Sequence, residues 1–328
     1  MGQKKDISIF EIAKITGFSP STVSRVLAGK NTAAVATREK ILAAAQKFNF
    51  KPATCPRRRT VALVVNLSDD RYSFYFDMML HGFIAETTAR GLDIKVYTRS
   101  NYQTLNPMHL DGMVVIPWNA ETAPWAASVP NLPCVLVNSY APPGCLAVCS
   151  DHYASGRMAA EFFIAQNVRG ACVTLDGSDW GSMERLRGFR ETLAAWEGDF
   201  APGRAAIHDW EGAENGRPTP PSDLLATRPR GVFMAGEDQL PLYLETIRRL
   251  GMRVPEDLEI VSMANPFSRA YISSRVTTIS QPFAEMRRAA IDLLLKRMDG
   301  EPVASPPPFA NAIAPRAGLG ENAAAQAA

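Results

Sequence analysis

The sequence lacks the features of a membrane or secreted protein. Its longest apolar runs, such as residues 61–65, fall far short of the roughly 18 apolar residues that a membrane-spanning helix needs. The N-terminal segment holds Lys4, Lys5, Asp6 and Glu11 without an apolar stretch or a small-residue cleavage site, which argues against a secretory signal. We therefore expect a cytoplasmic protein that has no membrane partner.

Cysteine and the common catalytic motifs are equally scarce. The five cysteines, at positions 55, 134, 145, 149 and 172, form no CxxC pair, which argues against a disulfide framework and a structural zinc site. The four histidines, 81, 109, 152 and 208, have no metal-ligand spacing. The motifs GxSxG, GxxxxGK(S/T), GxGxxG and HExxH are absent. The sequence thus predicts no cofactor, no bound metal and no enzyme.

What the chain does have is an uneven distribution of charge. Residues 1–60 hold twelve Lys or Arg against three acids, a net charge of +9, whereas the whole chain of 328 residues carries only +2. The rest of the chain is therefore acidic. A basic head on an acidic body suggests that the head meets a polyanion such as nucleic acid, although a solvated basic face has the same composition. The length predicts two or three domains.

Within the head, apolar residues recur at helical spacing in three short stretches. The first ends at Gly17, whose backbone freedom suits a helix C-terminus, and Ser19-Pro20 then restarts a helix with a good N-cap and a proline at the first helical position. The second helix ends near Ala28, and a third follows. Helix, short turn and helix is the arrangement of a helix-turn-helix, whose second helix reads the major groove of DNA. A plain helical hairpin is the alternative.

From Thr60 onward, short apolar strands alternate with amphipathic helices. Such alternation predicts parallel sheets covered on both faces, and the number of units exceeds one ordinary sheet. The expected fold class is therefore an N-terminal all-α helix-turn-helix domain joined to an α/β core of two doubly wound parallel-sheet subdomains, with a ligand site in the cleft between them. Strands are expected at 61–65, 94–97, 113–116, 134–137, 171–175, 231–235 and 259–263, and helices at 76–90, 156–166, 185–196, 240–250 and 283–298.

Several sequence motifs occur in the order found in one known family. In the head they are SPSTVSRVL at 19–27 and TREKILAAA at 37–45. In the body they are LDGMVV at 110–115, SDHYASGR at 150–157, ERLRGF at 184–189, LGMRVPEDL at 250–258 and TTISQP at 277–282. Together these motifs resemble the lactose/galactose-repressor (LacI/GalR) family of bacterial transcription regulators. The resemblance implies a periplasmic-binding-protein-like core that the chain crosses three times, and a homodimer bound to a pseudo-palindromic double-stranded DNA operator.

The resemblance also implies site residues. The effector-binding positions that it indicates are Tyr75, Phe76, Arg185 and Trp210. Glu237 and Asn265 are added because they stand at family site positions with altered residues, and Trp118 is added as a further aromatic candidate for the wall of the cleft. Plain packing is the alternative for Tyr75, Phe76 and Trp210, and a surface ion pair is the alternative for Arg185. The DNA-binding positions, including the basic hinge, are Ser19, Pro20, Ser21, Thr22, Ser24, Arg25, Asn31, Arg57, Arg58 and Arg59.

Four departures from the family pattern affect the expected mechanism. The hinge after the head is short, contains Pro56 and has no leucine to wedge into the minor groove. Ala34 replaces the serine that caps the third helix. The stretch 97–111 is too short for the family's second core helix. Ala264 stands where the family has an aspartate that binds sugar hydroxyls.

Two hypotheses about function follow. The first is a sequence-specific DNA-binding repressor whose operator affinity is modulated by a small polar molecule, sugar-like or nucleoside-like, bound in the cleft. The alternative is a regulator of the same fold with a degenerate cleft, which is effector-independent or controlled by a protein partner. In either case the protein should associate with the bacterial nucleoid when it is bound to its operator.

The expected domain boundaries follow the changes in pattern. We expect the helix-turn-helix domain at 1–52, a short basic hinge at 53–59, a core at 60–316 and a disordered tail at 317–328. Within the core, the N-subdomain should comprise about 60–150 and 280–304, and the C-subdomain about 151–279 and 305–316.

Overall fold

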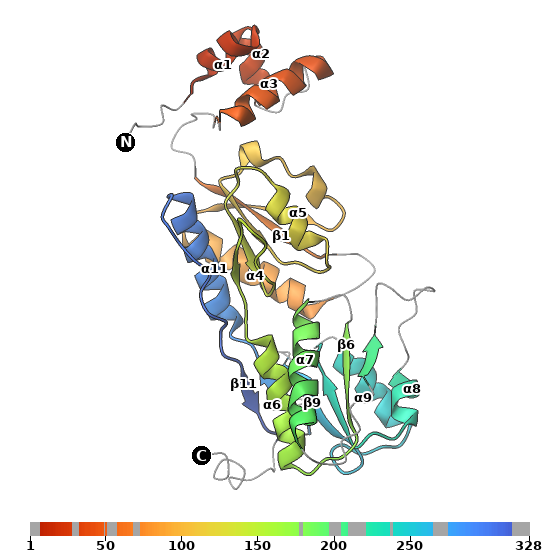
Figure 1. The fold of residues 1–328 in the computed structure, drawn as a ribbon. Helices are drawn as coiled ribbons and strands as arrows, with labels where there is room; N and C mark the ends of the chain where they lie inside the picture. The colour runs from red at the N-terminus through yellow and green to blue at the C-terminus, as the bar shows by residue number, and fades with distance from the viewer. Residues whose placement is uncertain are drawn as a thin grey trace.

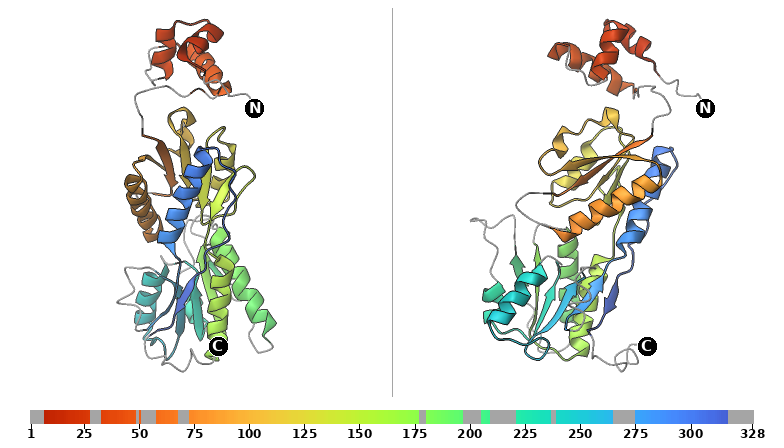
Figure 2. Two further views of the ribbon diagram at one scale, coloured as in Figure 1. Left: turned by 90° about the vertical axis from the view of Figure 1, so that its left-hand side faces the viewer. Right: turned by 180° about the vertical axis from the view of Figure 1, so that it is seen from behind.

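The structure is a computed structural model in which a small helical head stands at one end and two α/β units follow it (Figures 1 and 2). The residues that it describes are 7–27, 33–48, 50, 58–67, 73–176, 180–196, 205–208, 221–236, 239–264 and 275–316. The α/β unit next to the head is called the N-subdomain, and the far one the C-subdomain.

The head consists of α1 (Ile9–Thr16), α2 (Pro20–Leu27) and α3 (Val35–Lys47). A capping box begins α1, in which Ser8 and Glu11 each bond the other's backbone N–H, and Gly17 ends it with a φ of 77°. Apolar side chains of the three helices and of Phe50 form one small core. As the sequence predicted, Ala34, the residue directly before α3, provides no side-chain cap.

The N-subdomain is built on a parallel sheet with the strand order β2-β1-β3-β4-β5. Two helices cover one face, α4 (Phe74–Ala89) and α11 (Phe283–Met298). The other face is covered by α5 (Thr122–Ser128) and by the region of two single-turn helices, η1 (Tyr102–Thr104) and η2 (Pro107–His109). The strands are β1 (Thr60–Val65), β2 (Asp93–Thr98), β3 (Gly112–Val115), β4 (Cys134–Val137) and β5 (Leu146–Val148).

The C-subdomain repeats this plan with the strand order β11-β10-β9-β8-β6-β7. Its pairings are parallel except for that of β10 with β11. One face packs on α6 (His152–Ala165) and α7 (Trp180–Ala195), and the other on α8 (Pro221–Ala226) and α9 (Leu240–Arg249). The strands are β6 (Ala171–Asp176), β7 (Ala205–His208), β8 (Gly231–Met234), β9 (Glu259–Met263), β10 (Thr277–Ser280) and β11 (Ala312–Ala314).

The chain passes between the two units three times. The first passage joins β5 to α6, and the second joins β10 to α11. The third returns from α11 to β11, and there the Phe309 N–H donates to the Cys149 carbonyl at 2.9 Å while the Phe309 carbonyl accepts from Asp151 N–H at 2.8 Å. These backbone bonds tie the first and third passages together. In both sheets the strand order reverses once, between β1 and β3 and between β6 and β8, and ligands bind beyond the carboxyl ends of strands at such points.

The expected fold class is confirmed, while several element boundaries differ. Three of the expected helices begin earlier, at Phe74, His152 and Trp180. In the last two, small and polar residues in the first turn interrupt the apolar period without breaking the helix. The pattern missed β5, β7, β10 and β11, which are only three or four residues long. No helix in the described ranges is long and apolar enough to cross a membrane.

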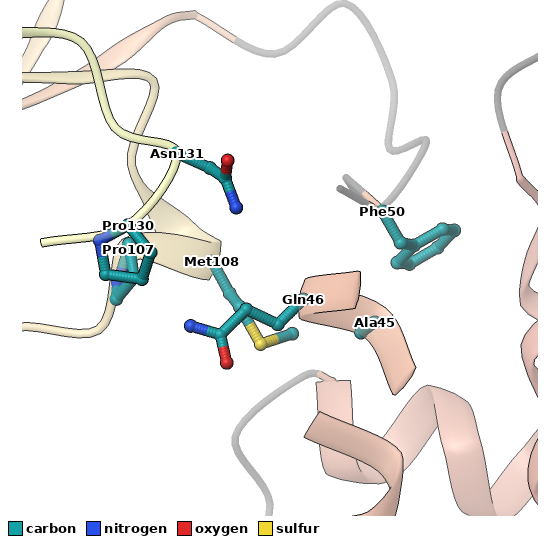
Figure 3. Close-up of a pocket in the computed structure, with 7 residues that line it drawn as sticks. All are labelled: Ala45, Gln46, Phe50, Pro107, Met108, Pro130 and Asn131. Atoms are coloured by element: carbon teal, nitrogen blue, oxygen red, sulfur yellow. The ribbon is translucent and has the colours of Figure 1, made fainter. Parts of the chain in front are cut away.

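The stretch 97–111 contains no α-helix, in agreement with its shortness, and instead turns toward the head. Met108 of η2 packs against the apolar core of the head. Figure 3 shows the small hollow that results, in which Ala45, Gln46 and Phe50 of the head face residues of the N-subdomain. The N-subdomain contributes Pro107, Met108, Pro130 and Asn131.

Candidate DNA-binding and effector sites

The helix α2 presents a polar face to solvent and an apolar face to the head. Val23, Val26 and Leu27 are buried in the head's core, so the rotation of the helix about its axis is fixed. Opposite them, the residues predicted to contact DNA are exposed or partly exposed: Ser19, Pro20, Ser21, Thr22, Ser24 and Arg25. The packing therefore presents the predicted DNA-reading residues as one surface.

Hydrogen bonds within α2 order that surface. The Ser19 hydroxyl accepts from the Thr22 backbone N–H at 3.2 Å and lies 2.9 Å from the hydroxyls of Ser21 and Thr22. One turn later, the Arg25 Nε donates to the Ser21 carbonyl at 3.2 Å. This bond holds the exposed guanidinium over the N-terminal end of the helix, which is the end that enters the major groove in a helix-turn-helix.

Two of the three hinge arginines, Arg58 and Arg59, are among the described residues. Arg58 is exposed, and Arg59 forms an ion pair with Asp299, just after α11, at 2.5 Å. In this conformation the Arg59 side chain is thus bound to the core. Asn31 and Arg57 lie outside the described residues.

A polar network joins the carboxyl ends of strands from both subdomains. Asn138, which follows β4, donates from Nδ2 to Tyr75 Oη at 3.1 Å and to Gln281 Oε1, beyond β10, at 3.0 Å. The Ser150 hydroxyl also donates to Gln281 Oε1 at 2.7 Å, and the Ser150 N–H donates to Asn138 Oδ1 at 3.2 Å. The network therefore fixes two of the three chain passages at the junction of the subdomains.

Arg185 is the buried cation beside this network. It lies on α7 with only 6% of its surface exposed, and its Nη1 donates to the Ala235 carbonyl, just beyond β8, at 2.6 Å. Its Nη2 lies 3.1 Å from Nδ1 of His152. The guanidinium is thus held at the place where the strand order of the C-subdomain reverses, between β6 and β8.

His152 is a neutral partner for that cation. Burial, and secondarily the charge of Arg185, lower the pKa of His152 well below its usual range. Because an arginine only donates, Nδ1 accepts and the ring carries its proton on Nε2. The buried Nε2 makes no hydrogen bond of its own within the described residues. His152 therefore orients Arg185 without adding a second positive charge.

The predicted aromatic residues separate into two groups. Tyr75 and Phe76 are half-buried at the start of α4, with ring centroids 5.1 Å apart, and Tyr75 joins the polar network. Trp118 is buried in the core of the N-subdomain, where its ring meets Tyr102 edge to face at 5.3 Å. The structure gives Trp118 a packing role and leaves Tyr75 and Phe76 at the junction.

Three predicted effector residues, Trp210, Glu237 and Asn265, lie outside the described residues. Ala264 follows β9 and is buried, and its N–H donates to the Ile279 carbonyl at 2.7 Å. Its methyl group supplies no acceptor to the junction.

Sequence reasoning missed the residues that link the subdomains: Asn138, Ser150, Gln281 and Asn311. Ser150 and Gln281 lie in the SDHYASGR and TTISQP motifs, so the signal was present but was used only to identify a family. Asn138 follows an apolar strand directly, which is the position where parallel sheets bind ligands. Asn311 donates to the Ser155 hydroxyl at 2.6 Å and to the Asp151 carbonyl at 2.9 Å, and no sequence pattern indicated it.

Comparisons with known proteins agree with this architecture. A family model described as bacterial regulatory proteins, lacI family, matches residues 8–53, and a model of the periplasmic binding protein-like domain matches residues 160–317. A curated relative, the HTH-type transcriptional repressor PurR of Aliivibrio fischeri strain MJ11, is 25% identical over 89% of this chain and 91% of its own length. The ribose operon repressor of Halalkalibacterium halodurans is 23% identical over 90% and 92%.

Solved structures with the same fold extend over nearly the whole chain. The transcriptional regulator CelR in complex with cellobiose is 24% identical and covers 94% of this chain and 99% of its own, with a TM-score of 0.65. The lac repressor dimer bound to operator and the anti-inducer ONPF is 19% identical and covers 95% and 98%, also with a TM-score of 0.65.

The head, the two-unit core and these matches define a DNA-binding transcription regulator with a helix-turn-helix and a periplasmic-binding-protein-like core. The head matches the lacI family of bacterial regulatory proteins, and over about nine-tenths of its length the chain is similar to repressors with the same domain arrangement.

Proposed function

We propose that this protein is a repressor that binds a pseudo-palindromic operator as a homodimer. Its affinity for the operator changes when a small polar molecule binds between its subdomains. The observation that carries the proposal is the exposed face of α2, where packing presents Arg25 and the hydroxyls of Ser19 and Ser21 together. The curated relatives are named as repressors, which supports the proposal and favours a role in regulation over one in catalysis.

Different residues of the head supply affinity for DNA and recognition of its sequence. The basic residues of the head neutralise phosphates and release counterions, which supplies affinity for any duplex. Arg25 can donate two hydrogen bonds to the edge of a guanine, which supplies discrimination between base pairs. The small hydroxyls at 19, 21, 22 and 24 let the backbone of α2 approach the groove closely, because none of them projects far from the helix.

The effector site is assigned to the junction around Arg185, with Tyr75 and Phe76 as an aromatic wall. Arg185 offers donors, so the ligand carries acceptor oxygens. One of the relatives is named as a ribose operon repressor, and the solved neighbours include complexes with cellobiose and D-xylulofuranose. Because Ala264 gives no acceptor, a simple hexose would leave a buried hydroxyl unpaired at a cost of about 1–3 kcal/mol. A ring with more acceptors, or one whose donors meet Glu237, fits better.

One experiment tests the DNA-binding half of the proposal. The full chain selects its operator from random duplexes, and Arg25→Ala is carried through the same selection. We expect the full chain to enrich a two-fold symmetric sequence with a guanine that the variant no longer selects. Enrichment of no common sequence by the unmodified chain would refute sequence-specific repression.

A second experiment tests the effector half and separates it from the effector-independent alternative. The full chain is heated with panels of sugars, polyols, nucleosides and sugar acids, because a ligand that binds only the folded state raises the midpoint of unfolding. Arg185→Ala is the matched variant, and it should lose the shift. If no compound in the panel raises the midpoint, the degenerate cleft suggested by Ala264 is favoured. Binding of a simple hexose at micromolar concentration would contradict the inference that Ala264 disfavours such a ligand.

A further inference from the structure

Two cysteines of the N-subdomain lie side by side at the amino ends of neighbouring parallel strands, Cys134 as the first residue of β4 and Cys145 directly before β5. Val135 pairs with Leu146 in the register of β4 with β5, so the preceding positions, Cys134 and Cys145, are neighbours. Their side chains hydrogen-bond to each other and belong to the same apolar cluster. Neighbouring strands are about 4.8 Å apart, which falls within the range of about 4.4–6.8 Å between the Cα atoms of a disulfide.

The two thiols differ in exposure and in acidity. Cys134 is only 5% exposed, whereas Cys145 is partly exposed and follows Gly144, whose φ of 88° forms a turn. The hydrogen bond that Cys134 donates lowers the pKa of Cys145, while the same bond, together with burial, raises the pKa of Cys134. An accessible, acidified thiol beside a buried partner is the arrangement of an attacking cysteine and a resolving cysteine.

The other cysteines of the described chain do not share this arrangement. Cys149 lies four residues after Cys145 along an extended segment, which separates them by roughly 13 Å at the rise of a strand. Burial and the nearby Asp151 raise the pKa of Cys149, so it is the weaker nucleophile. Cys172 is buried in the other subdomain and donates to the Gly231 carbonyl at 3.4 Å.

We propose that Cys134 and Cys145 form a modification site that peroxides oxidise to an intramolecular disulfide. The site lies at the amino ends of β4 and β5, whereas the effector junction lies at the carboxyl ends of the strands. Cys134 is only three residues after Asn131, which lines the hollow beneath the head. The proposal for this cysteine pair therefore does not depend on the proposed effector site, and its test is separate.

The chemistry balances with hydrogen peroxide as the oxidant. The Cys145 thiolate attacks one peroxide oxygen, the O–O bond breaks, and a sulfenic acid forms while hydroxide leaves and is protonated to water. The Cys134 sulfur then attacks the sulfenic sulfur, the S–O bond breaks and a second water leaves with the proton of Cys134. Two thiols lose two electrons in total, and the peroxide gains them. A small thiol such as glutathione reverses the step by exchange.

The test uses the reduced full chain, exposed to hydrogen peroxide, quenched, unfolded, alkylated and cleaved with trypsin. Residues 100–157 form one tryptic peptide that contains Cys134, Cys145 and Cys149. We expect it to be two hydrogens lighter and to carry one alkyl group, on Cys149, and a thiol reductant should restore all three alkyl groups. Fragment masses must place the link between Cys134 and Cys145.

Matched variants sharpen the result. Cys149→Ser should oxidise like the unmodified chain, whereas Cys145→Ser should leave Cys134 and Cys149 alkylated after the same exposure. In Cys134→Ser, Cys145 should stop at the sulfenic acid and be trapped by dimedone. A link from Cys145 to Cys149, or over-oxidation of Cys145 in the unmodified chain while Cys134 stays alkylatable, would overturn the proposal. The mapping on the unmodified chain decides the matter even if a variant fails to fold.

Discussion

Gly156 and Arg185 touch through their backbones. A Cβ atom added at Gly156 would lie 1.9 Å from the Arg185 carbonyl oxygen and 2.7 Å from the Phe189 nitrogen. The reciprocal contact places a Cβ on Gly188 at 2.1 Å from the Tyr153 carbonyl. The helices α6 and α7 therefore cross at the distance that two glycines permit, and this crossing sets the depth at which Arg185 reaches the junction.

The first prediction concerns this crossing. Gly156→Ala should lower the free energy of unfolding by about 1–3 kcal/mol, because the methyl group meets backbone that cannot move alone. In an open helix the same change would stabilise by about 0.5–1 kcal/mol, so the sign reports the contact. Urea unfolding measures it, and Arg157→Ala, on the exposed side of α6, is the control. An unchanged or raised stability would show that the helices separate freely.

The second prediction concerns pH. The pKa of His152 is lowered in the folded protein and returns to about 6.5 on unfolding. Between these values the unfolded chain binds a proton that the folded chain does not, so stability is present above pH 6.5 and falls as the pH drops below it. The slope should approach about 1.4 kcal/mol per pH unit for one proton.

Urea unfolding at several pH values between 5 and 8 measures this slope. In His152→Gln the slope over that window should become shallower by about one proton. Glu245 and Asp257, whose pKa values are lowered by arginine partners, lose their contributions only at lower pH. The same slope in both proteins would mean that His152 takes up its proton in the folded state.

The third prediction separates sequence reading from affinity. Arg25→Ala should cost about 1–3 kcal/mol on the selected operator and leave binding to random duplex nearly unchanged. Lys14→Ala, which removes a charge from α1, should weaken both equally. Binding titrations on both duplexes at one salt concentration measure this. An equal loss on both duplexes in Arg25→Ala would assign that side chain to the phosphates.

The fourth prediction concerns the hinge. Since the segment has Pro56 and three arginines, and no leucine to insert between base steps, we expect contact with phosphates and little kinking of the duplex. The operator should bend by less than about 40° in a phasing assay, the scale taken from single kinks. A larger bend would require a wedge that the hinge sequence does not contain.

The head and the alternation of the core were determined by sequence alone, because they depend on interactions a few residues apart. The capping box of Ser8 with Glu11, the turn at Gly17 and the cap at Ser19 each join residues no more than four apart, and the apolar period fixes which face of α2 is buried. The alternation of apolar strands and amphipathic helices, which is also a local pattern, predicted the fold class. The apolar pattern did not predict β10, because its residues Thr277, Thr278, Ile279 and Ser280 are mostly polar yet lie within the sheet.

Only the tertiary structure decided how the junction is built. Asn138 and Gln281 are 143 residues apart, and Arg185 and His152 are 33 apart, so no periodicity relates them. Trp118 was expected to be an aromatic residue of the effector site, but its buried ring packs against Tyr102 inside the core of the N-subdomain. The Cys134 and Cys145 pair likewise depends on the register of two strands. Side chains remote in sequence meet only when sheets and helices pack, and packing minimises exposed apolar surface over the whole chain rather than along any one segment.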